Sequence, residues 1–179
     1  NTLVDRITSD PPVDHPLRDK DPLMTVTEPF ALWVIQSSGR KEGLFDHENI
    51  IRSDDVLPYG LRKVRILNGA HTALVCKAMP MGLETVRKAI QNDEVKSWLL
   101  ELLHHEIIPT IEDRVVEPVR FAEACIERFS NPFLVHKLES IAWEHDVKVK
   151  IRLAQTYHEY ISKFDRKPPI LSGLVAQHI

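Results

Sequence analysis

Three polar side chains of complementary chemistry lie close together in the stretch Arg-Lys-Val-Arg-Ile-Leu-Asn-Gly-Ala-His: Lys63, Asn68 and His71. On an α-helix each residue advances by about 100°, so the three side chains are predicted to share one broad face. A desolvated lysine can exchange a proton near neutral pH, an asparagine amide can donate a hydrogen bond to a developing oxyanion, and a histidine can bond substrate hydroxyls. The trio therefore fits carbonyl reduction, while the same spacing is also typical of a solvated helix face.

The residues around the trio favour a buried helix. Apolar side chains flank it on both sides: Val64, Ile66, Leu67, Leu74 and Val75. Glycine inside a helix costs up to about 1 kcal/mol relative to alanine, so Gly69 calls for a packing or functional reason, such as close approach of a ligand or of another backbone. We interpret Cys76, further along the same helix, as a small core residue.

The composition is that of a globular protein and excludes several classes. The 179 residues are 43% hydrophobic and 27% charged, with a formal net charge of −3, which gives no basic field for nucleic acid. No apolar run reaches the length of a membrane span, and the N-terminal residues are too polar for a secretion signal. Cys76 and Cys125 are too few and too far apart for a disulfide framework or a zinc cluster. We therefore expect a cytoplasmic globular protein.

The pattern of apolar residues predicts a mainly α, multi-helical domain with an irregular N-terminal arm. Prolines interrupt residues 1–27, where long helices cannot form. The apolar run 30–35 fits either a strand or a buried turn of helix. The expected helices lie from about residue 60 through Cys76, near 98–107 with an end or kink at Pro109, from Glu117-Pro118, from Asn131-Pro132, over 146–163, and from Leu171 to Ile179. In the helix from Glu117-Pro118 the apolar residues Phe121, Cys125 and Phe129 are spaced four apart on one face. The buried stripe expected for the helix from Asn131-Pro132 consists of Phe133, Leu134, Leu138 and Ile141.

The motif Lys-x4-Asn-x2-His, within Arg-Lys-Val-Arg-Ile-Leu-Asn-Gly-Ala-His-Thr-Ala-Leu, closely resembles the signature of the long-chain mannitol dehydrogenase family. Three other blocks resemble further segments of that family, in the family's order: Asn1-Thr2-Leu3-Val4-Asp5-Arg6-Ile7, Glu28-Pro29-Phe30 with Trp33-Val34-Ile35, and Arg128-Phe129-Ser130-Asn131-Pro132 followed by Lys148. The resemblance implies that Lys63 is the general acid/base and that Asn68 and Asn1 form the oxyanion hole. It also implies that His71 and Lys148 bind the substrate.

Two departures bear on the substrate that this resemblance implies. Gly60 and Ser140 stand where polyol-oxidising members tend to carry an acidic residue and an arginine, which puts mannitol in doubt. The residues of the blocks resemble most closely those of the tagaturonate reductases (altronate oxidoreductases). This resemblance implies the reaction that converts D-tagaturonate and NADH to D-altronate and NAD. Such a sugar acid needs a cationic partner, for which Lys148 is the first candidate and Lys150 or Arg152 the next. Fructuronate reductase, mannitol 2-dehydrogenase and, in another class, a non-catalytic helical interaction domain remain alternatives.

The resemblance also bears on cofactors and domains. Family members bind NAD mainly through an N-terminal Rossmann domain, and no Gly-x-Gly-x-x-Gly occurs in this chain. We therefore interpret residues 1–179 as the C-terminal substrate domain, with the nucleotide domain as its expected partner and no metal. His104-His105-Glu106 lacks the spacing of a metal motif and is expected to be a solvated helix face. We interpret His136 and His145 as lone histidines with structural explanations. The sequence leaves open the oligomeric state and the choice between NAD and NADP.

Overall fold

The computed structural model describes residues 2–5, 8–28, 30–37 and 47–178. The chain separates into two compact units, Asn1–Tyr59 and Gly60–Ile179, and each is treated by itself. The second unit is helical, so the prediction of a mainly α fold is confirmed.

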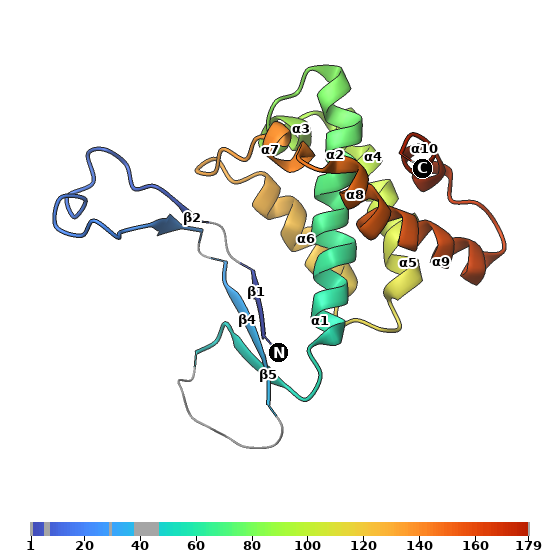
Figure 1. Cartoon of the computed structure of the whole chain (residues 1–179), viewed down its shortest axis with the longest axis horizontal. Coiled ribbons are helices and arrows are strands. Elements are labelled where there is room, and N and C mark those ends of the chain that lie inside the picture. Colours follow the sequence, from blue (N-terminus) through green and yellow to red (C-terminus); the bar gives the residue numbers. More distant parts are fainter. Residues whose placement is uncertain (1, 6–7, 29, 38–46, 179) are drawn as a thin grey trace. The chain divides into compact units, whose positions relative to one another are not determined.

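The first unit contains two small sheets where the sequence suggested an irregular arm (Figure 1). In the three-stranded sheet, β4 (Leu32–Gln36) lies between β1 (Thr2–Asp5), which is antiparallel, and β5 (Ile50–Ser53), which is parallel. The second sheet pairs β2 (Thr8–Ser9) with β3 (Val26–Thr27). The run 30–35 is thus mostly strand, in keeping with its aromatic and β-branched residues.

The second unit is built from helical segments joined by short turns. In chain order these are α1 (Leu57–Arg62, which begins just before the unit), η1 (Lys63–Asn68), α2 (Gly69–Ala78), η2 (Met79–Met81), α3 (Val86–Gln91), α4 (Asp93–Glu101), η3 (Leu102–Ile107), α5 (Ile108–Ile111), α6 (Pro118–Phe129), α7 (Leu138–Ala142), α8 (His145–Val149), η4 (Lys150–Ala154), α9 (Gln155–Phe164) and α10 (Pro169–Ala176). The helix predicted from Glu117-Pro118 is confirmed as α6, with Phe121, Cys125 and Phe129 buried on one face. No helix in the described ranges is long and apolar enough to cross a membrane.

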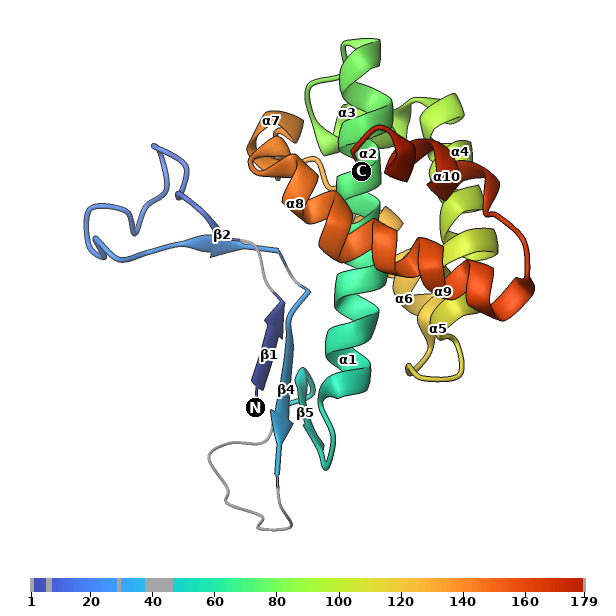
Figure 2. The ribbon, with the colours of Figure 1, turned by 45° about the vertical axis from the view of Figure 1, so that its right-hand side comes forward.

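Helix α2 forms the centre of this unit and contacts α4, α7 and α8 (Figures 1 and 2). The largest fully buried apolar side chains come from helices distant in sequence: Ile66, Leu74, Leu99, Leu102, Leu103, Ile107, Ile111, Leu138, Leu153 and Leu171. Burial of this core is the main force that holds the helices together.

Three of the segments, η1, η3 and η4, are π-helical turns inside longer helices. They meet at Gly69, where an added Cβ would lie 3.7 Å from Ile107 Cδ1 and 3.7 Å from Leu153 Cδ2. Gly69 therefore faces the packed interior of the helical unit. The sequence predicted a regular α-helix over this stretch, and single π turns such as these are frequent at functional sites.

The turn η3 precedes Pro109, where the sequence predicted an end or a kink. Proline has no N–H to donate to the preceding turn, and its ring crowds the carbonyl four residues earlier. The wider π turn accommodates this defect, and the helix continues beyond it as α5.

The helix predicted from Asn131-Pro132 is wrong in its start. The helix α7 begins only at Leu138, and Phe133, expected in its buried stripe, is 87% exposed. Asn131 Oδ1 accepts a hydrogen bond from the Phe133 N–H in a local turn. The backbone just before α7 pairs with the backbone near Glu84, since the Leu138 N–H donates a hydrogen bond to the Glu84 carbonyl.

Candidate active site

Three of the predicted site residues, Lys63, Asn68 and His71, lie on the central helix that runs through α1, η1 and α2. Lys63 and Asn68 are the two ends of the π turn η1, and His71 lies in the first turn of α2. In an α-helix residues five apart point about 140° away from each other, whereas the i to i+5 repeat of a π turn brings them closer to one face. The π turn therefore improves the alignment of Lys63 with Asn68 over the regular helix that the sequence predicted. All three side chains are half-buried.

A buried arginine in the same turn attaches η1 to α9. Arg65 Nη1 donates to Thr156 Oγ1 at 2.6 Å, and its Nη2 donates to Glu159 Oε1 at 2.7 Å. The side chain of Arg65 is only 1% exposed. This contact fixes the turn that carries Lys63 and Asn68.

The imidazole of His71 is held between aromatic rings. Its centroid lies 4.4 Å from that of Phe129 and 5.0 Å from that of His136. Its Nε2 is buried and makes no hydrogen bond with any residue in the described part of the chain. A buried polar atom without a protein partner is costly unless something else binds it, so Nε2 is suited to a ligand.

Four basic side chains of the described residues influence the protonation of His71. Burial, and then the charges of His136, Arg128, Arg152 and Lys63, lower the pKa of His71 to about 3. The ring is therefore neutral near physiological pH. A neutral imidazole can donate a hydrogen bond to a hydroxyl or accept one from it, and it adds no positive charge to the site. A cluster of cations in a half-buried setting is suited to an anionic ligand.

Arg152, in η4, is linked to the central helix by a short chain of hydrogen bonds. Its Nη1 donates to Thr72 Oγ1 at 3.1 Å, and the Thr72 hydroxyl donates to the Asn68 carbonyl at 2.9 Å. Burial lowers the pKa of Arg152, which indicates a partly desolvated guanidinium. From the sequence, Lys148 is the first candidate for the carboxylate partner and Arg152 a later one. In the structure, the positive charge of Arg152 contributes to the lowered pKa of His71.

Lys148 has a structural contact in addition to its predicted role. Its Nζ donates to the Ile141 carbonyl at 2.8 Å and so ties α8 to α7. An ammonium has three N–H donors, so this bond leaves further donors, and substrate binding by Lys148 stays a prediction. Lys150 is exposed. Asn1 lies outside the described residues, so its predicted part in the oxyanion hole stays a prediction as well.

Two functional candidates near His71 were missed as individual residues. Arg128 belongs to a sequence block that resembles the family, but the block predicts no role for it. The sequence alone indicates a structural role for His136 as a lone histidine. Spacing along one helix could not find them, because they lie more than fifty positions beyond His71 in the sequence. Only the fold brings them to the ring.

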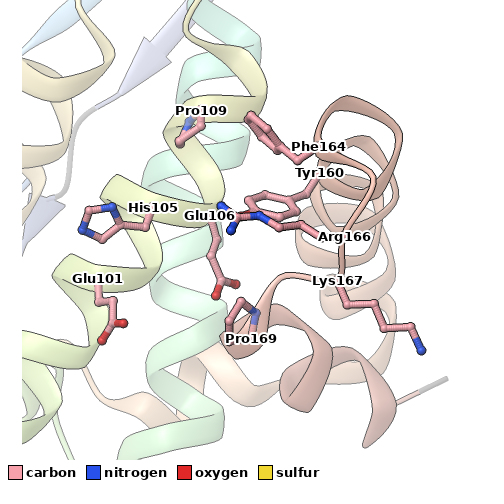
Figure 3. A pocket seen from close by; sticks show the side chains of 9 residues that line it. All are labelled: Glu101, His105, Glu106, Pro109, Tyr160, Phe164, Arg166, Lys167 and Pro169. Carbon is pink, nitrogen blue, oxygen red and sulfur yellow. The ribbon is translucent and has the colours of Figure 1, made fainter.

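A hollow of about 440 Å³ in the helical unit lies at a different place (Figure 3). It is lined by residues of the α4–α5 helix and of the α9–α10 segment, among them Glu101, His105 and Tyr160, and includes none of the predicted trio. Glu106 in its wall is 3% exposed, and its two oxygens accept the Ile170 and Leu171 N–H groups at 2.7 Å each. The expectation of a solvated face was therefore wrong for Glu106, which caps the start of α10.

The helical unit thus presents a half-buried lysine, asparagine and histidine beside cationic side chains on a central helix. The chain belongs to the family of mannitol dehydrogenase C-terminal domains, which matches residues 55–179. The family resemblance inferred from the sequence blocks is confirmed.

Curated relatives extend this match to the N-terminal residues. Altronate oxidoreductase of Bacillus subtilis is 38% identical over 180 residues, covering 94% of this chain and 37% of that protein. Altronate oxidoreductase of Halalkalibacterium halodurans is 34% identical, covering 96% of this chain and 35% of that protein. The chain therefore spans a little over a third of the length of these relatives.

Two solved structures share the fold. The Pseudomonas fluorescens mannitol 2-dehydrogenase, in a ternary complex with NAD and D-mannitol, aligns with a TM-score of 0.76 at 24% identity, covering 98% of this chain and 37% of that chain. A substrate-free D-sorbitol dehydrogenase aligns with a TM-score of 0.77 at 28% identity, covering 91% of this chain and 35% of that chain. At 24% identity the first of these supports the fold alone.

Proposed function

We propose that this chain is the substrate-side, catalytic part of an NAD-dependent oxidoreductase that interconverts D-tagaturonate and D-altronate. The names of the relatives that are 34–39% identical support an altronate oxidoreductase. The observation that carries the proposal is the buried Nε2 of His71, which has no hydrogen-bond partner among the described residues and is influenced by the charges of Lys63, Arg128 and Arg152. Such a site offers a neutral hydrogen-bonding group for sugar hydroxyls next to cations for a carboxylate.

NAD does not fit this chain by itself. The sequence contains no Gly-x-Gly-x-x-Gly, the phosphate-binding motif of a dinucleotide domain. We propose that another domain of the full-length protein binds the cofactor, which supplies a hydride as NADH during reduction and accepts it as NAD during oxidation. The residues discussed below act on the substrate.

Lys63 is proposed as the general acid/base. It gives a proton to the ketone oxygen during reduction and takes it back from the alcohol during oxidation. Asn68, at the other end of the same π turn, donates from its amide to the oxygen while negative charge develops there, and Asn1 is proposed as a second donor. The attachment of η1 through Arg65 keeps Lys63 and Asn68 in register, which supports this division of roles.

The remaining residues are proposed to hold the sugar acid. His71 bonds a hydroxyl through Nε2, and Arg152 or Lys148 pairs with the carboxylate. Arg152 is favoured by its contribution to the electrostatics of His71 and by its bond to Thr72. The alternative of a non-catalytic interaction domain is less well supported, because the trio is half-buried and a solvated face would leave His71 Nε2 accessible to water.

The test is a substrate panel on the full-length protein with NADH, comparing tagaturonate, fructuronate and fructose. We expect tagaturonate to give the highest kcat/KM. The Lys63→Ala variant should lose about 100-fold or more in kcat with a modest change in KM. Lys88→Ala removes an exposed lysine on α3 and serves as the matched control, with unchanged kinetics.

The panel also separates the alternatives. Preference for fructuronate or fructose would replace tagaturonate as the substrate and keep the enzyme class. Arg152→Gln should raise the KM for a sugar acid more than the KM for fructose. The sugar acid loses the cation that pairs with its carboxylate, whereas fructose has no carboxylate. Wild-type turnover in the Lys63→Ala variant would contradict the acid/base role.

A further inference from the structure

A cysteine and two histidines from three distant segments come together in a cluster that includes none of the predicted trio. Cys76 lies in α2, His145 is the first residue of α8, and His178 lies in the turn after α10. Cys76 Sγ is 3.1 Å from His145 Nε2 and 3.8 Å from His178 Nε2. Cys76 packs against the hydrophobic core, as the sequence suggested, but His145 is not a lone histidine, because the fold brings it to the Cys76 sulfur.

The atoms of this cluster are arranged as ligand atoms are around a metal. The sulfur and the two nitrogens all lie within 4.8 Å of one another. Zn–S bonds of about 2.3 Å and Zn–N bonds of about 2.0–2.1 Å at tetrahedral angles put the sulfur about 3.6 Å from each nitrogen. The observed distances of 3.1 and 3.8 Å lie on either side of that value, so small side-chain rotations would admit the ion.

A fourth residue supports the same interpretation. Asp146 Oδ1 lies 2.8 Å from His178 Nδ1. A carboxylate on the far nitrogen places the proton at Nδ1 and leaves the Nε2 lone pair facing the sulfur. Metal-binding histidines are usually oriented by a carboxylate or carbonyl in this way.

We propose that Cys76, His145 and His178 form a binding site for a divalent transition-metal ion of the zinc type, with Asp146 orienting His178. Thiolate and imidazole ligands together favour such an ion over calcium or magnesium, which prefer oxygen. Three protein ligands leave a fourth position for water or another small ligand. The site fastens the C-terminal turn to α2 and α8, and it uses none of the residues proposed for catalysis or substrate binding.

Binding would change the protonation of the cysteine. Burial raises the pKa of Cys76 to about 11, so without a metal the group is a thiol. The ion displaces that proton to solvent and forms the metal–thiolate bond, as metal ligation by cysteine requires. In the alternative arrangement the three groups only share hydrogen bonds between sulfur and nitrogen.

The first experiment is a titration of the intact protein, free of any affinity tag, with Co²⁺ as a spectroscopic substitute for zinc. We expect a thiolate-to-cobalt charge-transfer band that saturates at a single ion per chain. The band should be lost in Cys76→Ser and retained in Cys125→Ala, which leaves Cys76 as the remaining cysteine of this chain. Absence of the band from the wild-type protein, or its persistence in Cys76→Ser, would overturn the proposal.

The second experiment remains decisive if Cys76→Ser does not fold. Zn²⁺ at about 100 times its Kd should raise the Tm of the wild-type protein by about 5–10 °C. The shift should disappear in His178→Ala, whose side chain lies outside the helices, and Asp146→Asn should weaken Zn²⁺ binding by about 10- to 100-fold. His158→Ala, an exposed histidine on α9, is the control and should keep the full shift. An equal shift in His178→Ala, or none in the wild-type protein, would exclude the site.

Discussion

Arg65 and Glu159 form an ion pair inside the helical unit, with Nη2 2.7 Å from Oε1. The second carboxylate oxygen, Oε2, accepts a hydrogen bond from Arg114 Nη2 at 2.5 Å. Glu159 therefore joins two arginines from different parts of the chain: Arg65 in the π turn that carries Lys63, and Arg114 in the turn after α5. Burial lowers the pKa of Arg65, and the attraction of Glu159 opposes this effect.

Removal of Glu159 should destabilise the protein strongly. In Glu159→Ala, the fully buried guanidinium of Arg65 loses its carboxylate, and loss of one partner of a buried pair costs about 3–5 kcal/mol. The free energy of unfolding can be measured with urea. Glu94→Ala, which breaks the exposed pair with Lys77, is the control and should have a far smaller effect. Equal effects of the two substitutions would show that Arg65 is satisfied without Glu159.

Gly69 should tolerate alanine despite its place among three π turns. Its φ of −59° and ψ of −48° are ordinary helical values, and the added Cβ would make normal contacts at 3.7 Å with Ile107 and Leu153. We expect Gly69→Ala to leave stability unchanged or to raise it by up to about 1 kcal/mol, since alanine has the higher helix propensity.

The matched control for this substitution is Gly82→Ala. Gly82 has a φ of +76° and ends η2 in the left-handed region. Alanine is strained there, so the variant should be less stable by about 1 kcal/mol. Thermal unfolding of both variants gives the comparison. A clear loss of stability in Gly69→Ala would show that the π turn itself depends on glycine.

The part of the fold that could be predicted from the sequence is the part set by local signals. Glu117-Pro118 and the four-residue spacing of Phe121, Cys125 and Phe129 correctly predicted α6. The π turns could not be predicted in this way, because they meet through side chains from three segments at Gly69. The helix predicted from Asn131 was wrong for a related reason. An asparagine side chain can cap a helix or stabilise a local turn. Here the turn forms, and the backbone that follows it pairs with the segment near Glu84.

The candidate site also contains residues that local sequence could identify and residues that only the fold brings together. Lys63, Asn68 and His71 are close in sequence and could be singled out from one motif. Arg152 and His136 reach the surroundings of His71 only through tertiary packing. The motif could therefore identify the central helix of the site, while its cationic surroundings depend on the fold.

Glu106 should be needed for the docking of α10. Its oxygens accept the N–H groups of Ile170 and Leu171, whereas a glutamine offers one oxygen and an NH₂ group that cannot accept. Glu106→Gln should therefore leave a backbone N–H unsatisfied and cost about 1–3 kcal/mol. Hydrogen exchange should become faster at the Ile170 and Leu171 amides.

Glu101→Gln provides the control for this prediction, because Glu101 is exposed and one helical turn away from the buried carboxylate. It should leave exchange at α10 unchanged. Slow exchange at both α10 amides in Glu106→Gln would mean that other groups hold this end of the helix.

Stability should fall with pH below neutrality because His71 is neutral in the folded protein. Burial and neighbouring cations lower the pKa of His71 to about 3, whereas an unfolded histidine has a pKa of about 6.5. As the pH falls through about 6.5, the unfolded state takes up a proton that the folded state does not bind. The free energy of unfolding should therefore decrease, by about 2 kcal/mol between about pH 7 and pH 5 from this group alone.

The contribution of His71 can be isolated by comparing the wild-type protein with His71→Gln, which does not titrate in this range. Burial also lowers the pKa values of His136 and His145, and these groups add their own loss of stability at acid pH in both proteins. In His71→Gln the pH dependence should be shallower by the amount that His71 contributes, because glutamine binds no proton in either state. Urea unfolding of the two proteins at several pH values between about 7 and 5 measures the difference. Parallel curves would mean that His71 becomes protonated within the folded protein, and the neutral imidazole proposed to bond a sugar hydroxyl would then be wrong.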